Sequence, residues 1–150
     1  MSNAYGSALR MLSRRELSEA QVRQRLARQR HNEEEIDDAI AKLKSERAID
    51  DTRVAEAVAR TETGKRRGKQ RVKRQIESLG ISSATARRAV DEVFESIDPE
   101  ALIASALAKR LRGNATISDD REFQRLYRYL VGQGFDADQV MRTLDRKRKS

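Results

Sequence analysis

Apolar residues recur at helical spacing along most of the chain, and polar residues fill the positions between them. Val72, Ile76 and Leu79 fall at i, i+4 and i+7, which predicts one buried stripe on a helix. A first short helix is predicted over residues 8–15, with Leu9 and Leu12 facing inward. The pattern predicts an all-α protein without strands. Residues that favour a helix start mark most of the later helices; they are Ser18, Asn32, Asp50 or Asp51, Ser82 or Ser83, Pro99, Ser118 with Asp119, and Asp136.

The apolar pattern occurs three times at constant offsets. Each copy has a helix, a short turn and a second helix, and two of the three turns contain Gly followed by an apolar residue. A Gly at that place suits a left-handed C-cap, with the apolar residue packing back on the helix. Val22, Leu26, Ile36 and Ile40 match Val72, Ile76, Ala86 and Val90, and also Leu126, Leu130, Val140 and Leu144; the turns are Arg30 and His31, Gly80 and Ile81, and Gly134 and Phe135.

This periodicity is typical of a tandem array. It predicts three three-helix, helix-turn-helix-like repeats over residues 8–49, 50–98 and 99–150, while residues 1–7 are expected to be disordered or to include a tag scar. We expect an elongated or curved array, although the repeat spacing is also compatible with a compact stack.

The chain is strongly basic, with 32 Lys and Arg against 24 Asp and Glu, a formal net charge of +8 and a pI near 10.2. The excess is uneven: the first repeat has ten basic and eight acidic residues, the second has eleven and nine, and the third has eleven and seven. Within the second repeat, however, residues 65–74 contain no acid. We call this run the basic segment; its cations are Lys65, Arg66, Arg67, Lys69, Arg71, Lys73 and Arg74.

A solvated helix face is the ordinary explanation for a charge run, but such faces usually mix both signs. The basic segment therefore predicts a surface that binds a polyanion or an acidic protein. Arg125 and Arg128 are the third-repeat counterparts of Arg71 and Arg74 and extend the predicted surface. For the basic tail at residues 146–149, a frayed end and a binding contact are equally compatible with the sequence.

Catalytic chemistry has little support. One His and no Cys exclude Cys–His nucleophilic sites and thiolate metal sites, and His31 is predicted to be a partly buried turn residue. The acidic clusters lie at predicted helix starts, where capping explains them without a metal. Residues 64–69 lack the spacing and the Ser or Thr of a phosphate-binding P-loop. We predict no enzymatic activity, no cofactor and no metal site.

The composition also bears on location. No apolar run approaches the roughly 20 residues that span a bilayer, so no membrane association is expected. The absence of Cys fits a cytoplasmic protein.

Residues 48–81 also carry a family resemblance. The order Ile49-Asp50-Asp51, a small-residue helix, a basic loop containing Gly, and a helix ending in Leu-Gly-Ile resembles the RecX family of regulatory proteins that act on RecA recombinase. The resemblance extends over nearly the whole chain in length, helix count and repeat layout. Val54 and Val58 stand where that family often has aromatic residues, and Gln75 and Ile76 replace a common Glu-Leu pair.

The resemblance implies a non-enzymatic negative modulator that lies in the groove of a RecA filament on single-stranded DNA. There it would restrain ATP hydrolysis, strand exchange and filament extension, and so act in homologous recombination, DNA repair and the SOS response. Our own hypothesis is that the basic segment anchors the protein in the filament. We expect a monomer, although the sequence leaves a dimer open, and weak binding of double-stranded DNA stays open as well.

Two alternatives come from the residues themselves. One is a helix-turn-helix protein that recognises duplex DNA, although the three Glu at residues 33–35 would repel phosphates. The other is a basic helical scaffold that binds an acidic protein.

Overall fold

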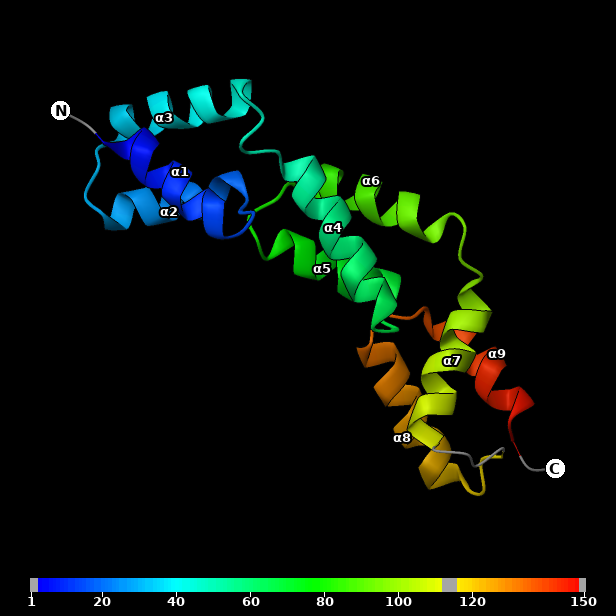
Figure 1. Ribbon diagram of the computed structural model, residues 1–150. Helices are drawn as coiled ribbons and strands as arrows, with labels where there is room; N and C mark the ends of the chain where they lie inside the picture. The colour runs from blue at the N-terminus through cyan, green and yellow to red at the C-terminus, as the bar shows by residue number, and fades with distance from the viewer. Residues whose placement is uncertain (1–2, 112–115, 149–150) are drawn as a thin grey trace.

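The computed structural model describes residues 3–111 and 116–148, which fold into nine helices (Figure 1). The only other regular element in these two ranges is an isolated β-bridge between Ile117 and Arg148. The predicted all-α fold is confirmed. The helices are α1 (Ala4–Arg14), α2 (Glu19–Arg28), α3 (Glu33–Ser45), α4 (Asp51–Gly64), α5 (Lys69–Glu77), α6 (Ser83–Phe94), α7 (Pro99–Leu111), α8 (Asp120–Gly132) and α9 (Ala137–Arg146).

Side-chain caps determine where most of these helices begin. In six of them the N-cap oxygen accepts a hydrogen bond from the backbone N–H three residues later, which satisfies a donor that the helix leaves unpaired. α7 begins at Pro99, where a missing N–H removes no intrahelical bond, and the Asp98 carboxylate before it accepts from the N–H of Glu100 at 3.0 Å. α5 follows Gly68 and has no side-chain cap. The capping residues are Ser18, Asn32, Asp50, Ser82, Asp119 and Asp136.

Each group of three consecutive helices encloses its own hydrophobic core. Many of the fully buried residues occupy the apolar positions that recur in the sequence, so the repeat pattern is a pattern of core residues. The first core includes Val22, Leu26, Ile40 and Leu43; the second includes Val72, Ile76, Ala86 and Val90; the third includes Ile103, Leu107, Leu130, Val140 and Leu144.

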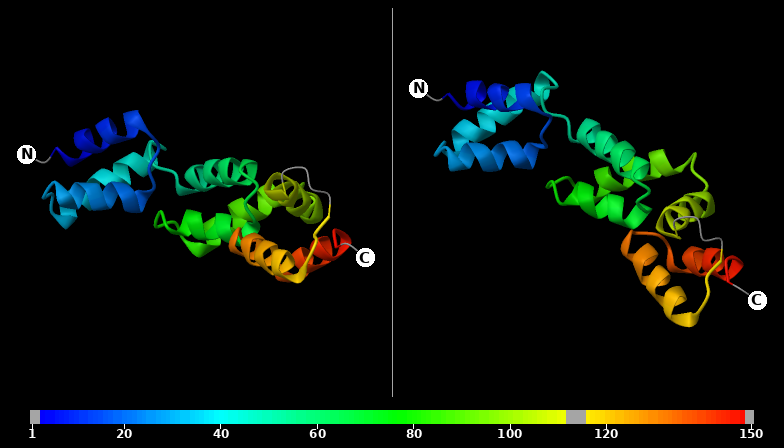
Figure 2. Two further views of the ribbon diagram at one scale, coloured as in Figure 1. Left: turned by 90° about the horizontal axis from the view of Figure 1, so that it is seen from below. Right: turned by 60° about the horizontal axis from the view of Figure 1, so that its bottom comes forward.

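The three repeats follow one another in a row, with the chain ends at opposite extremes of an elongated molecule (Figures 1 and 2). The helices pack mainly within each group of three: α1 packs against α3, α4 against α6, and α7 against α9. This arrangement exposes a long surface relative to the size of each core. None of the described helices combines the length and hydropathy that a membrane crossing requires.

Equivalent joints connect neighbouring repeats. The Ser18 hydroxyl, at the start of α2, donates to the carbonyl oxygen of Leu79 after α5, at 2.5 Å. The N–H of Gly68, at the start of α5, donates to the carbonyl oxygen of Gln133 after α8, at 2.7 Å. Residues 18 and 68 occupy equivalent repeat positions, as do 79 and 133. The start of the second helix in one repeat therefore rests on the turn after the second helix in the next.

Glycine is required where the second and third repeats meet. Gly134 has φ +98°, in the left-handed region, and a Cβ on it would overlap the backbone nitrogen of Arg71. A Cβ on Gly68 would likewise overlap the backbone of Gly134 and Phe135. This approach lets the carbonyl of Gly134 accept the N–H of Gln70 at 3.1 Å. The third repeat thus supplies the cap that α5 lacks.

Several details of the sequence prediction need correction. α1 begins at Ala4 instead of residue 8, because Ala4, Ser7 and Ala8 face the first core. Residues 4–7 were expected outside the fold and belong to this helix. Because that face of α1 is the buried one, Leu9 does not face inward and is 39% exposed, while Leu12 is partly buried.

Leu79, which was predicted on the buried stripe, is only half-buried and packs against the edge of the second core. The apolar pattern also predicts Val58, Val93 and Phe94 inside, and they too pack at this edge. The sequence further predicts that the helix starting at Pro99 ends near Gly113 and Asn114, which lie outside the described residues.

Candidate polyanion-binding surface

The basic segment spans the turn after α4 and most of α5. Arg66 occupies the left-handed region with φ +61° and reverses the chain direction between the two helices. The stripe of Val72 and Ile76 is fully buried, as predicted, and holds α5 against α4 and α6. The segment is therefore fixed on the second core, and its cations project from a rigid element.

A buried carboxylate neutralises the start of this segment. Glu62, in the last turns of α4, is 3% exposed and accepts a hydrogen bond from the Arg67 guanidinium at 2.8 Å. The ammonium of Lys65 lies 3.9 Å from the same carboxylate. A buried carboxylate requires such partners, because an unpaired charge in a core is costly. The segment has no acid in its sequence, but the fold brings one to it.

A second acid approaches from α6. The ammonium of Lys69 lies 2.8 Å from the carboxylate of Asp91, and both side chains are about half exposed, at 52% and 51%. Exposed ion pairs of this kind contribute little to stability and exchange partners readily. Lys69 therefore remains available to another anion.

Two further cations connect the second repeat to the third. Arg66 donates to the hydroxyl of Ser105 in α7 at 2.9 Å, and Arg71 donates to the side-chain oxygen of Gln133 at 2.8 Å. Both contacts lie beside the Gly68–Gly134 joint. Arg66 and Arg71 thus act between the repeats of this chain.

The side chains of the remaining four predicted cations have no hydrogen bond or ion pair within residues 3–111 and 116–148. Arg74 and Arg128 occupy equivalent positions on α5 and α8, and both are exposed. Lys73 is half-buried and Arg125 is exposed. The nine predicted residues therefore divide into five with partners and four that are free to meet an anion.

Lys73 lies in a hollow that the sequence did not reveal. Lys69, Lys73 and Arg87 line a space of about 310 Å³ between α5 and α6, together with Asp91. Arg87 is exposed and unpaired within the described parts of the chain. It escaped the sequence analysis because it lies on the next helix, outside any long basic run. Packing α6 against α5 is what brings it beside Lys73.

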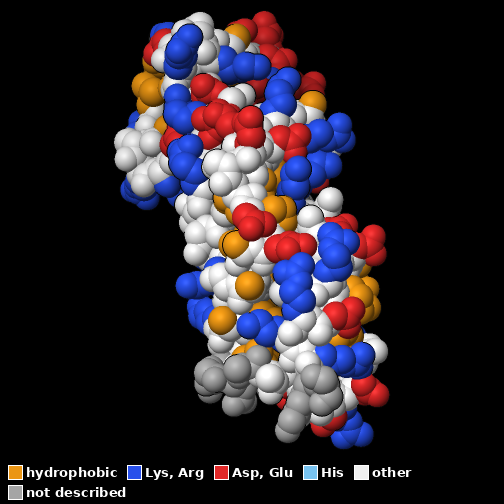
Figure 3. Space-filling view, turned by 90° about the vertical axis from the view of Figure 1, so that its right-hand side faces the viewer, with side chains coloured by type: hydrophobic (Ala, Val, Ile, Leu, Met, Phe, Trp, Pro, Cys, Tyr) orange, Lys and Arg blue, Asp and Glu red, His pale blue; other side chains and the backbone are white. Residues whose placement is uncertain are grey.

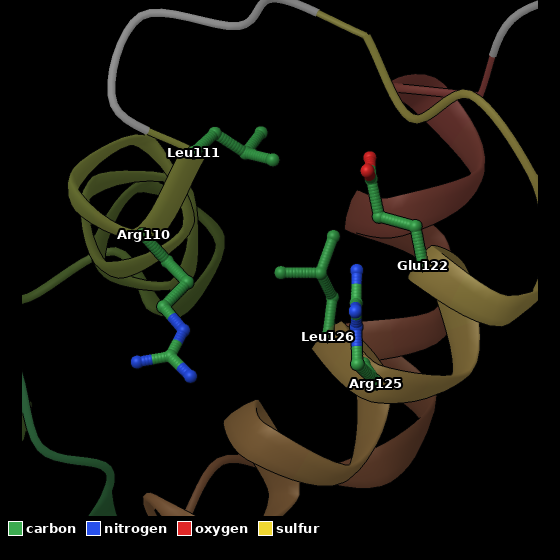
Figure 4. A pocket seen from close by; sticks show the side chains of 5 residues that line it. All are labelled: Arg110, Leu111, Glu122, Arg125 and Leu126. Atoms are coloured by element: carbon green, nitrogen blue, oxygen red, sulfur yellow. The ribbon is translucent and has the colours of Figure 1, made fainter.

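Arg125 lies in a different hollow, of about 340 Å³, between α7 and α8 (Figure 4). Arg110 and Arg125 come from the two facing helices, and Glu122 lines the same space. The Arg110 guanidinium also packs over the Tyr129 ring, 4.4 Å from its centroid. This hollow combines both signs of charge.

The basic tail contacts the third repeat as far as the structure describes it. Arg146 pairs with Glu100 at 2.8 Å, and Arg148 pairs with Asp120 and covers the Phe123 ring. Lys149 lies outside the described residues. These contacts favour a packed role for the tail over a frayed end.

No group of three or more His, Asp or Glu side chains in the described ranges is placed to hold a metal ion. His31 is partly buried, as predicted, and lies 3.5 Å from Glu35. On the face shown in Figure 3, Lys and Arg side chains alternate with Asp and Glu. This face therefore has no extended region of a single sign of charge.

Comparisons with known proteins agree with this fold. Residues 4–43 match the family model described as RecX, first three-helix domain, and residues 98–144 match RecX, third three-helix domain. The chain is 31% identical to Regulatory protein RecX from Halorhodospira halophila, over 89% of this chain and 81% of that protein. It is 33% identical to Regulatory protein RecX from Neisseria meningitidis serogroup B, over 91% and 86%.

Solved structures show the same architecture. A crystal structure of RecX from Lactobacillus salivarius aligns with a TM-score of 0.77 at 23% identity, covering 96% of both chains. A second crystal structure, of a regulatory protein RecX, aligns with a TM-score of 0.78 at 22% identity, covering 95% of this chain and 72% of that one. The chain belongs to the RecX family.

Proposed function

We propose that this protein is a non-enzymatic negative regulator of RecA that binds along the groove of the RecA–single-stranded DNA filament. In that position it inhibits ATP hydrolysis, strand exchange and filament extension. A cytoplasmic location and a monomeric state belong to the same proposal. Its main support is the family membership, since the relatives are named regulatory proteins.

The geometry is compatible with a filament as partner. A rigid array presents similar faces at regular steps, which suits a partner that is itself built from repeated subunits. The joints keep Arg74 and Arg128 at equivalent positions on successive repeats. Free cations on successive repeats would speed association with an acidic groove or exposed phosphates and make it sensitive to salt.

A test of the proposal should change cations whose side chains have no partner among the described residues, because these can be changed without breaking a contact of the fold. Reversing Arg67 or Arg71 would break the Glu62 ion pair or the contact with Gln133, so loss of function would have a structural explanation. Arg74→Glu with Arg128→Glu changes two exposed positions without partners. The matched control is Arg60→Glu with Arg121→Glu, which makes the same charge change at exposed positions without partners on α4 and α8.

The experiment is the single-stranded-DNA-dependent ATPase of the cognate RecA, titrated with each protein at substoichiometric ratios. We expect the natural sequence and the control to inhibit alike, and the Arg74→Glu, Arg128→Glu variant to need about tenfold more protein. Absence of inhibition by the natural sequence, with active RecA, would overturn the proposal. A sequence-specific footprint on duplex DNA would favour the helix-turn-helix alternative instead.

A further inference from the structure

The first repeat contains a groove lined by arginines that lies outside the predicted surface. Arg10 and Arg14 of α1, with Arg15 just after it, form one side, and Arg25 of α2 contributes the other. The groove has a volume of about 310 Å³. We call it the arginine groove.

No carboxylate neutralises this groove. None of its four guanidinium groups has a hydrogen bond or an ion pair in the described ranges, and no Asp or Glu lines the space. The acids of the repeat lie elsewhere: Glu19 pairs with Arg23 and Lys44, and Asp37 pairs with Arg23. Since the first repeat is nearly balanced in total charge, its fold must separate the two signs.

The groove is a fixed feature of the repeat. Ser7 is 8% exposed and its hydroxyl donates to the side-chain oxygen of Gln29 at 2.5 Å, which connects the two helices beside the arginines. Ala4 and Ala8 are buried in the core below, and Met11 and Leu12 pack against the same core further along α1. The backbone that carries the arginines is therefore fixed, so binding an anion has to order only their side chains.

The equivalent groove of the second repeat is different. It lies between α4 and α5, and its lining includes Glu16, Val58, Glu62 and Gln75 but no Lys or Arg. Gln75 occupies the repeat position of Arg25. The three-helix fold therefore does not by itself require cations in this groove.

The lining selects one class of ligand. Arg10 and Arg14 are four residues apart and so lie about 6 Å apart along one helix face. Guanidinium groups bind phosphate oxygens through paired hydrogen bonds. The lining contains no aromatic ring on which a base would stack, and Met11 is its only apolar residue. An acidic protein would need apolar anchor sites that this groove does not offer.

We propose that the arginine groove between α1 and α2 binds the phosphate backbone of single-stranded nucleic acid, independently of base sequence. It is a contact of the first repeat, separate from the basic segment. It does not require RecA, so its test and the ATPase test can fail separately.

The test measures binding of a labelled oligo(dT) to the full chain by fluorescence anisotropy over a range of NaCl concentrations. The variant is Arg10→Gln with Arg14→Gln, which keeps helix propensity close to that of Arg. The control is Arg60→Gln with Arg121→Gln. Log K falls as log salt rises, and each lost phosphate contact makes this slope shallower by about 0.7. The slope should therefore become shallower by about 1.4 for the groove variant and stay unchanged for the control.

Two further measurements make the result decisive. Circular dichroism verifies that the variant folds, and Arg10→Lys with Arg14→Lys should retain the salt slope while losing affinity, since Lys cannot form the paired bonds. Three results would overturn the proposal: no binding of oligo(dT), an equal decrease in variant and control, or Arg10- and Arg14-dependent binding of poly-glutamate without such binding of DNA.

Discussion

The basic segment and the arginine groove differ in how their positive charge is used. The segment has seven cations in ten residues, yet five of them contact Glu62, Asp91, Ser105 or Gln133. The groove collects four arginines from two helices, and none of these has a partner in the described parts of the chain. A run of charge in a sequence is thus a poor measure of the charge available to a ligand.

The partners of the segment fall into two groups. Arg66 and Arg71 contact the third repeat and so help to join two repeats. The other three cations pair with Glu62 or Asp91 of the second repeat itself. The side chains of the first repeat that contact the second repeat through hydrogen bonds or ion pairs are Glu16 and Ser18, so the groove arginines take no part in the contacts described at that joint.

The largest expected effect concerns the joint that the segment supports. Gly134→Ala places a Cβ against the backbone of Arg71 at a positive φ, and neither the backbone nor the turn has room to adjust. We expect a loss of about 3 kcal/mol or more in the free energy of unfolding and separation of the third repeat from α5. Thermal unfolding and small-angle scattering would measure the two effects.

Gly132→Ala is the matched control, because a Cβ there meets nothing within 4 Å. Being in α8, it should be neutral or slightly stabilising. If both variants keep the stability and dimensions of the natural protein, then Arg66 and Arg71 hold the joint without the close backbone contact.

A smaller loss of stability than that of Gly134→Ala is expected when either of the two acids that face the basic segment is removed. Glu62 and Asp91 each lie 2.8 Å from a cation, but their side chains are 4% and 51% exposed. Glu62→Ala leaves Arg67 without its buried partner and should cost about 2 to 3 kcal/mol. Asp91→Ala should cost about 0.5 kcal/mol or less. Chemical denaturation of both variants measures these costs.

The same pair of variants also bears on binding. Asp91→Ala leaves Lys69 unpaired and should strengthen binding of a polyanion, whereas Glu62→Ala should disturb the second repeat as a whole. Equal loss of stability in the two variants would contradict the distinction between structural and available cations.

The sequence predicted the elements of this fold well because the determinants are local. Caps such as Ser18 and Asn32 act within one turn of helix, and the core stripe of Val72 and Ile76 follows from spacing. The prediction for Leu9 was wrong because the small residues Ala4 and Ala8 form the buried face of α1, and small residues contribute little to a hydrophobic pattern.

The candidate surface was harder to predict because it depends on contacts between distant residues. Glu62 precedes the basic segment, but only its burial reveals that it neutralises Arg67. Arg10, Arg14 and Arg25 are scattered among other charges in the sequence, and the packing of α1 on α2 brings them together. Counting the charges within a segment of the sequence reveals neither the Glu62–Arg67 ion pair nor the arginine groove.

The smallest expected effect concerns the exposed ion pairs of the basic tail. The hydrogen bond from Arg146, assisted by Arg142, lowers the pKa of Glu100 below its usual value of 4.5. A carboxyl whose pKa is lowered in the folded state stabilises that state above pH 4.5, and the contribution is lost as pH falls through the folded pKa. The protection factors of the amides in α9, which correct for the pH dependence of intrinsic exchange, should therefore fall between about pH 5 and pH 3, and Glu100→Gln should remove this part of the pH dependence. Identical profiles in the two proteins would mean that the backbone bond from Ile117 to Lys147, at 2.8 Å, holds this end of the chain without help from the tail's ion pairs.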